Sequence, residues 1–90
     1  MNTYVNIQSN TTQDHFQVSL HFSESQLTLT RPQGFKRPIT TTLRLADIKH
    51  LIIDESFGSP IISFFYQDRR YTFYETGPAV TEYLRDNLAA

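Results

Sequence analysis

Residues 16–30 read FQVSLHFSESQLTLT, and in them apolar and polar side chains alternate on both sides of a short polar interruption. The apolar positions are Phe16, Val18, Leu20 and Phe22 before the interruption and Leu27 and Leu29 after it. Strict alternation of aromatic and aliphatic residues with polar ones is typical of half-buried β-strands. The stretch therefore predicts a β-hairpin, with strands at about 16–22 and 26–31.

Five further segments of the chain are expected to be strands. They lie at about 3–8, 37–45, 48–53, 60–66 and 70–75. The sequence Arg31-Pro32-Gln33-Gly34 is expected to end the strand before it, because proline lacks the N–H that a sheet needs and glycine accepts a positive φ. Ile48, Leu51 and Ile52 also fit helical spacing, but the β-branched content of this segment favours a strand.

The periodicity changes near the end of the sequence. Apolar side chains now recur at spacings of three and four, which predicts an amphipathic helix over about 77–89. They are Val80, Tyr83, Leu84 and Leu88. Thr76 is expected to cap this helix, since a threonine hydroxyl can accept a hydrogen bond from the first turn. With 90 residues and no linker or repeat, the chain is expected to form one mainly β (α+β) domain over residues 1–90.

Seven strands followed by one C-terminal helix resemble the pleckstrin-homology (PH) superfold, in which two near-orthogonal antiparallel sheets form a partly open barrel. The segment Leu43–Leu51, LRLADIKHL, is similar to the one that joins the two sheets in bacterial PH-like and GRAM-like domains. The final hairpin, Ile61–Phe64 and Arg70–Phe73, is similar as well. The resemblance implies a seven-stranded PH-like barrel that is capped by the C-terminal helix.

This resemblance has consequences for the helix and for lipid binding. It implies that Val80, Leu84 and Leu88 cover the open end of the barrel, with Tyr83 at the margin. Lipid-binding members of the family carry several Lys or Arg residues in the loop between their first two strands. The corresponding residues 9–15 contain none, so the chain departs from the usual phosphoinositide-binding pattern at this loop.

Charge and composition limit which partners and which cellular compartment are expected. The chain has 8 Lys and Arg against 9 Asp and Glu, so its overall charge gives no attraction to nucleic acid, and a membrane is not the favoured partner. It has no cysteine, which excludes disulfides and thiolate metal sites. Residues 1–10 lack the features of a signal peptide, and the apolar run 61–66 is too short to span a bilayer. A cytoplasmic location is therefore expected.

No catalytic arrangement stands out in the sequence. The three glycines are isolated, and no serine has the flanking glycines of a nucleophile elbow. Asp54 and Glu55 are adjacent on an extended segment, so they point to opposite faces and do not form an acid–base pair. The three histidines, His15, His21 and His50, lack the close spacing of helical metal ligands. We therefore expect no catalytic residues, no metal and no cofactor.

Two basic clusters at hairpin tips are the candidate binding residues. The first consists of Arg31, Lys36 and Arg37, and the second of Arg69, Arg70 and the adjacent Tyr71. Such clusters suit a phosphate or a carboxylate-bearing partner, although surface cations on hairpins also protect sheet edges from aggregation. An exposed tyrosine beside them would suit protein recognition, whereas a buried one would pack in the core with its hydroxyl at the rim.

Three functional hypotheses follow from these observations. The first is a non-catalytic binding module that acts through protein–protein interaction or self-association. The second is a binder of anionic ligands or lipid headgroups that uses the basic hairpin tips. The third is a metal protein or enzyme centred on the three histidines.

Overall fold

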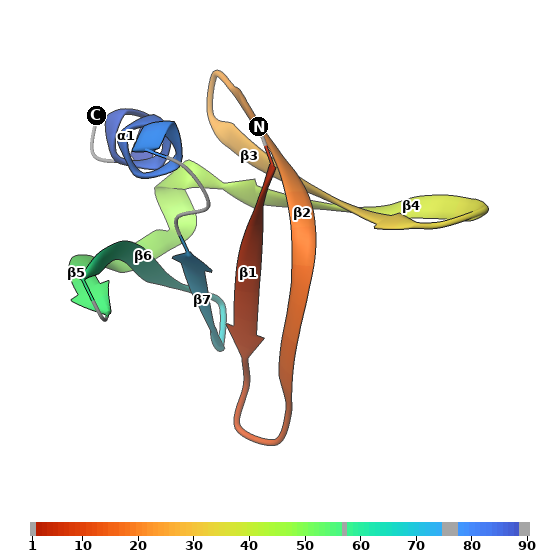
Figure 1. Ribbon diagram of the computed structural model, residues 1–90, viewed down its shortest axis with the longest axis horizontal. Helices are drawn as coiled ribbons and strands as arrows, with labels where there is room; N and C mark the ends of the chain where they lie inside the picture. Colours follow the sequence, from red (N-terminus) through yellow and green to blue (C-terminus); the bar gives the residue numbers. More distant parts are fainter. Residues whose placement is uncertain (1, 57, 75–77, 89–90) are drawn as a thin grey trace.

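The computed structural model describes residues 2–56, 58–74 and 78–88, and in these residues seven antiparallel strands form one sheet that is followed by one C-terminal helix (Figure 1). The strands are β1 (Asn2–Gln8), β2 (Gln13–Ser23), β3 (Gln26–Gln33), β4 (Lys36–Arg44), β5 (Ile48–Ser56), β6 (Ser59–Tyr66) and β7 (Arg69–Tyr74). The helix is α1 (Pro78–Leu88), and a 3₁₀ turn, η1 (Leu45–Asp47), links β4 to β5. The mainly β architecture expected from the sequence is thus confirmed.

The strand order is β4-β3-β2-β1-β7-β6-β5, with β1 in the centre and β4 and β5 at the two edges. Within the described residues β4 and β5 do not pair with each other, so the sheet is not closed into a barrel. In Figure 1 the outer part of the β3–β4 hairpin projects to one side of the molecule, whereas β5, β6 and β7 lie on the other. The two free edges of the sheet therefore face different directions.

The core lies on the inner face of this sheet. Its buried apolar residues are Val5, Val18, Leu20, Leu27, Leu29, Leu43, Ile62, Phe64, Tyr71, Phe73 and Leu84. The alternation in residues 16–30 explains four of them, because every second side chain of β2 and β3 points inward. Phe16 and Phe22, which continue the same phase, are half-buried at the margins of the core.

The helix packs against the core, as its spacing predicts. Leu84 is only 1% exposed, and Leu88 and Tyr83 are half-buried against the same cluster. The Tyr83 ring meets Phe22 of β2 edge-on, with 5.2 Å between the ring centroids. The expected roles of Thr76 and Val80 fall outside the residues whose side chains the structure describes.

The strand boundaries differ from the sequence-based expectation by up to three residues, since β2 already begins at Gln13 and β5 continues to Ser56. Two further differences have a clear physical reason. Pro32 does not end β3, which continues to Gln33 with a shift of register after Arg31. Because β2 pairs with β3 only as far as Thr30, Pro32 has a neighbouring strand on one side, where its missing N–H is tolerated. Leu45 does not belong to β4 but opens η1, and its N–H donates a hydrogen bond of 2.9 Å to the Ser25 carbonyl.

Candidate functional site

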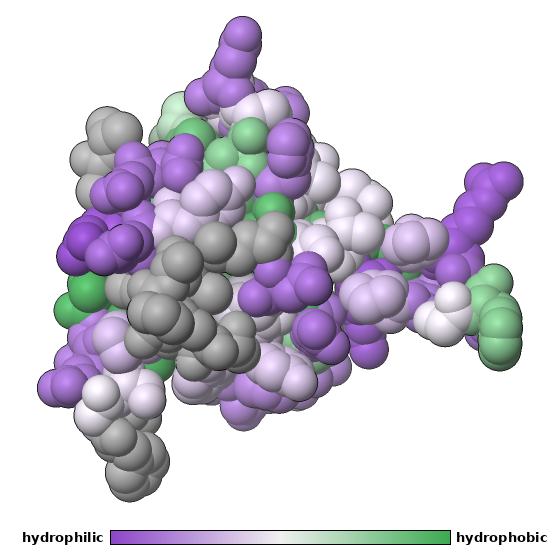
Figure 2. Space-filling view, turned by 45° about the horizontal axis from the view of Figure 1, so that its top comes forward, coloured by the Kyte–Doolittle hydropathy of each residue, from purple (hydrophilic) through white to green (hydrophobic). Residues whose placement is uncertain are grey.

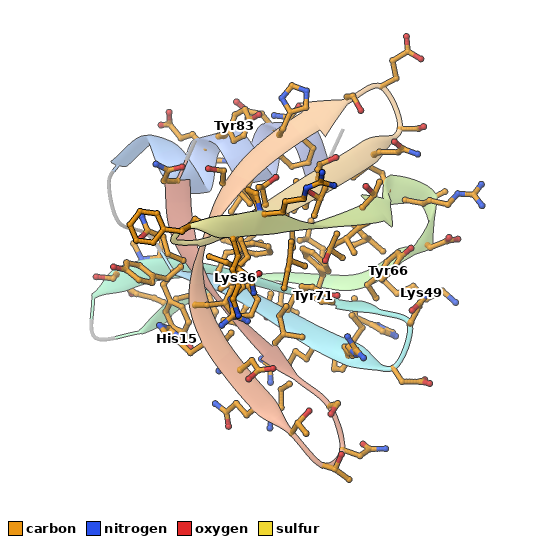
Figure 3. All side chains as sticks on the ribbon, turned by 90° about the vertical axis from the view of Figure 1, so that its right-hand side faces the viewer. His15, Lys36, Lys49, Tyr66, Tyr71 and Tyr83 are labelled. Atoms are coloured by element: carbon orange, nitrogen blue, oxygen red, sulfur yellow. The ribbon has the colours of Figure 1, made fainter. Side chains whose placement is uncertain are left out.

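The outer part of the β3–β4 hairpin, residues 31–40, is the most exposed feature of the described structure, and we call it the basic arm. Every side chain in it is exposed. The cations Arg31, Lys36 and Arg37 lie in it, and Figure 3 views the molecule from the side toward which the arm projects, with Lys36 labelled. Because the arm extends beyond the end of its pairing with β2, its outer residues project from the body of the molecule, while Arg31 and Ile39 at its inner end lie beside the core residues Val18 and Leu29.

Charge is unevenly distributed between this hairpin and the rest of the chain. Residues 26–44 hold four of the eight Lys and Arg residues and none of the nine Asp and Glu residues. The remaining residues therefore hold four cations and nine carboxylates. The net charge of −1 is the sum of a cationic hairpin and an acidic remainder of the chain. The net charge therefore does not show how strongly the hairpin itself attracts an anionic partner.

Phe35 lies at the apex of the basic arm and is the residue that the sequence analysis missed. Its relative exposure is 111%, the highest among the exposed large apolar residues. Figure 2 shows the arm as a projection that ends in a hydrophobic group beside hydrophilic ones. Gly34, with φ of 65°, allows the tight turn that presents Phe35. The available signal was a phenylalanine next to a turn glycine inside an acid-free segment.

A small hollow lies on the inner face between the arm and the β6–β7 turn. Its volume is about 170 Å³, and it is lined by Ile7, Asp14, Phe16, Val18, Leu29, Arg31, Ile39, Thr41 and Arg69. The Arg31 guanidinium lies over the Phe16 ring, 4.2 Å from its centroid, in a cation–π arrangement. The hollow thus has an apolar floor and two cations and a carboxylate at its rim. It could accept a small group that carries a single negative charge.

The candidate binding residues do not form two compact clusters. Arg31 and Arg69, from the two different hairpins, meet at this hollow, whereas Lys36 and Arg37 lie further out on the arm. Arg70 lies on the opposite face of β7 from Arg69, because neighbours in a strand alternate. Its Nη2 donates a long hydrogen bond of 3.5 Å to the Ser63 hydroxyl.

Tyr71 belongs to the core. It is 3% exposed, and its ring stacks on Phe64 with 5.4 Å between the centroids. Burial raises the pKa of the Tyr71 hydroxyl above its ordinary value of 10.0, against the opposing effect of the Arg69 charge and hydrogen bond. Of the two alternatives raised by the sequence, Tyr71 follows the one in which it packs in the core.

Because the pKa of Tyr71 is raised, we expect the free energy of unfolding to depend on pH in alkaline solution. Above pH 10.0 the unfolded chain loses the Tyr71 proton while the folded chain keeps it, so the unfolded state binds fewer protons. The free energy of unfolding should therefore fall as pH rises through this window, by at most about 1.4 kcal/mol per pH unit. Urea unfolding at several pH values should show a shallower fall in Tyr71→Phe. Equal slopes in the two proteins would contradict the assignment.

The three histidines have separate surroundings. His15 stacks on Tyr4, with 5.7 Å between the centroids, and His50 meets Phe65 edge-on. His21 is exposed on β2. In the described part of the chain, no three His, Asp or Glu side chains are grouped as a metal site would require. Asp54 accepts a hydrogen bond of 2.7 Å from the Glu55 N–H.

An open hollow of about 650 Å³ lies on the β5–β6 side of the molecule. It is lined by Asp47, Lys49, His50, Phe65 and Gln67. Asp47 is already 4.0 Å from Arg44, in an ion pair that is exposed to solvent. The position of His50 reflects a break in the β5–β6 register, since the backbone has φ of 56° there.

A comparison of the chain with protein-family models and with curated protein sequences gives no match. None of the helices in the described residues is both long enough and apolar enough to cross a membrane.

Proposed function

We propose that this protein is a non-catalytic binding module that recognises a protein partner through the basic arm. The observation that carries the proposal is Phe35, a fully exposed aromatic side chain at the apex of a cationic hairpin. Burial of a phenylalanine side chain in a partner's pocket contributes about 1.5–3 kcal/mol. Among the residues that the structure describes, no neighbouring group offers such burial at the arm's apex.

The charges around Phe35 specify the chemistry of the partner. Lys36 and Arg37 follow Phe35 directly, and the hairpin holds no carboxylate to neutralise them. An acidic surface with an apolar pocket would match both features. Cations at the rim of such a contact mainly speed association and select the partner, while the central aromatic side chain supplies most of the affinity.

We also propose that the sheet is a PH-like one. Three observations support this: the order β4-β3-β2-β1-β7-β6-β5, the turn η1 within LRLADIKHL, and the packing of α1 on the core. In that architecture the two halves of the sheet form the walls of a partly open barrel. The fold itself does not determine a ligand, so the functional proposal rests on the arm.

The arm variants Phe35→Ser and Lys36→Glu/Arg37→Glu test this function. Affinity capture with the purified chain should recover a defined protein that both variants lose, by tenfold or more. Arg85→Glu, which changes an exposed charge on α1, is the matched control and should retain the protein. All three variants should melt like the unmodified chain, because the altered side chains are exposed. Equal capture by the arm variants and the control would contradict the proposal.

The same arm favours a second candidate, an anionic lipid surface. An apolar tip flanked by cations can insert among lipids while each cation contributes about 1 kcal/mol near anionic headgroups. Sedimentation with phosphatidylcholine vesicles, with and without phosphatidylserine, separates the two candidates. Binding that needs phosphatidylserine, weakens with salt and disappears in the arm variants would replace the protein partner by a membrane.

A further inference from the structure

Among the described strands, β4 and β5 are the two free edges of the sheet, and their charges are opposite. The β4 edge carries Lys36, Arg37 and Arg44 and no carboxylate. The β5 edge ends in Asp54 and Glu55, with no cation among its last six residues. Free strand edges expose unpaired N–H and C=O groups, and they pair readily with other strands that match them.

Each edge also exposes aliphatic side chains. Ile39 of β4 and Ile52 and Ile53 of β5 are each about half exposed. On each edge the exposed isoleucines lie beside charges of one sign, so a strand of opposite charge could cover them. The two edges therefore carry complementary charges and apolar side chains of the same kind.

We infer that the β4 edge of one copy of this chain docks on the β5 edge of a second copy. The inference rests on the proposed function and names a second copy as the protein partner of the arm. Lys36 and Arg37 begin β4 at the outer end of the arm, which Figure 1 shows on the other side of the molecule from β5, and β4 does not pair with β5 in the described residues. The contact must be intermolecular.

An antiparallel alignment of β4 with the β5 of the second copy brings opposite charges together. It places the start of β4, with Lys36 and Arg37, against the end of β5, with Asp54 and Glu55. Asp54 and Glu55 point to opposite faces of their strand, so each face of the joined sheet can pair a cation with a carboxylate. A parallel alignment would instead bring Arg37 close to Lys49 and repel.

The isoleucines lie at matching distances from these charges. Ile39 follows the cations by two positions, and Ile52 and Ile53 precede the carboxylates directly. The antiparallel alignment therefore brings the isoleucines of the two copies together. Burial of this apolar area adds to the charge pairing and makes the contact specific to these two segments.

The contact should be short and sensitive to salt. Pro38 contributes no N–H to a ladder, and the register shift between Lys49 and Ile52 ends the regular part of β5. Only a few residues of each edge can then pair, and the side-chain charges speed their association and fix their alignment. Such charges are screened as ionic strength rises.

The contact joins two different surfaces, so it does not close by itself. A pair of copies would still have one free β4 edge and one free β5 edge. Contacts of this kind build rings or open chains, depending on the rotation between neighbours. Association should therefore continue beyond a dimer as the protein concentration rises.

Two charge-reversed variants test the inference. The basic-edge variant is Lys36→Glu/Arg37→Glu, and the acidic-edge variant is Asp54→Lys/Glu55→Lys. In sedimentation velocity at low salt, the unmodified chain should associate with increasing concentration, and added salt should reverse this. Each variant alone should associate at least tenfold more weakly, because both of its edges then carry the same sign.

An equimolar mixture of the two variants is the decisive sample. Every contact between unlike variants joins opposite charges, so the mixture should regain the association that each variant lost. Arg85→Glu serves as the control and should associate like the unmodified chain. Because all the altered side chains are exposed, melting curves should be unchanged and verify that the variants are folded.

Several outcomes would overturn the inference. A strictly monomeric unmodified chain at low salt would do so, as would a mixture that stays monomeric. Continued association of the basic-edge variant would show that β4 is not used, for example because two β5 edges pair. If the chain is monomeric but the arm variants still lose a different captured protein, the binding function stands and the second copy is excluded.

Discussion

Phe64→Ala is expected to destabilise the folded chain by about 3–5 kcal/mol, the cost of removing a buried aromatic side chain without full collapse of the cavity. Phe64 is 0% exposed and lies on β6 in the centre of the core. Its ring stacks on Tyr71 and lies 5.7 Å from Phe73, measured between centroids. The substitution therefore removes two aromatic contacts as well as buried area.

Urea unfolding followed by circular dichroism measures this loss. Phe65→Ala is the matched control, since Phe65 is the next residue of the same strand, faces the other side of the sheet and is 40% exposed. It should cost clearly less, because less apolar surface is buried there. A domain of this size has a total stability of about 5–15 kcal/mol, so Phe64→Leu supplies a milder variant if Phe64→Ala does not fold. Equal losses at positions 64 and 65 would contradict the assigned inner face.

The contrast between Phe64 and Phe65 shows where sequence reasoning reaches its limit in this fold. Alternation in residues 16–30 predicted correctly that Val18, Leu20, Leu27 and Leu29 point inward. The run IISFFY at 61–66 is apolar on both phases, so periodicity does not separate the inner phenylalanine from the outer one. The pairing of Phe64 with Tyr71 of β7 settles the question, and that pairing is a property of the whole sheet.

The number of strands and their succession along the chain were predictable for a different reason. Short polar turns and one change of period divide the chain into segments that can be counted. Pro32 was misleading, because its effect depends on the strands beside it: β2 no longer pairs with β3 at that point. Pro32 by itself predicted that β3 ends at this point. The strand continues, because β3 has a neighbour on one side only and the missing N–H is tolerated there.

The candidate site was predictable in its residues but not in its arrangement. Local sequence identified the cations of the two hairpins. It did not show that Arg31 and Arg69 line the same hollow, because that depends on how the two hairpins approach across the sheet. Phe35 and the lack of carboxylates in residues 26–44 were missed, the latter because net charge was averaged over the chain.

Leu84→Ala is expected to cost about 2–5 kcal/mol of folding free energy. Leu84 is the described α1 residue that is fully buried, at 1% exposure, and it joins the core formed by the sheet. With no disulfide available, the attachment of the helix depends on such apolar contacts. For a chain of this length, a loss of 1 kcal/mol lowers the melting temperature by roughly 4–8 °C. The variant should therefore melt at least about 8 °C below the unmodified chain.

Leu88→Ala is the matched control for this prediction, since it is the same substitution on the same helix at a half-buried position. It should cost clearly less than Leu84→Ala, because less apolar area and a smaller cavity are involved. An unchanged melting temperature in Leu84→Ala would mean that the helix does not cover the core. The helix would then be a candidate binding surface and not a structural element. An amphipathic helix whose apolar side is not covered by its own chain is expected to bind a partner.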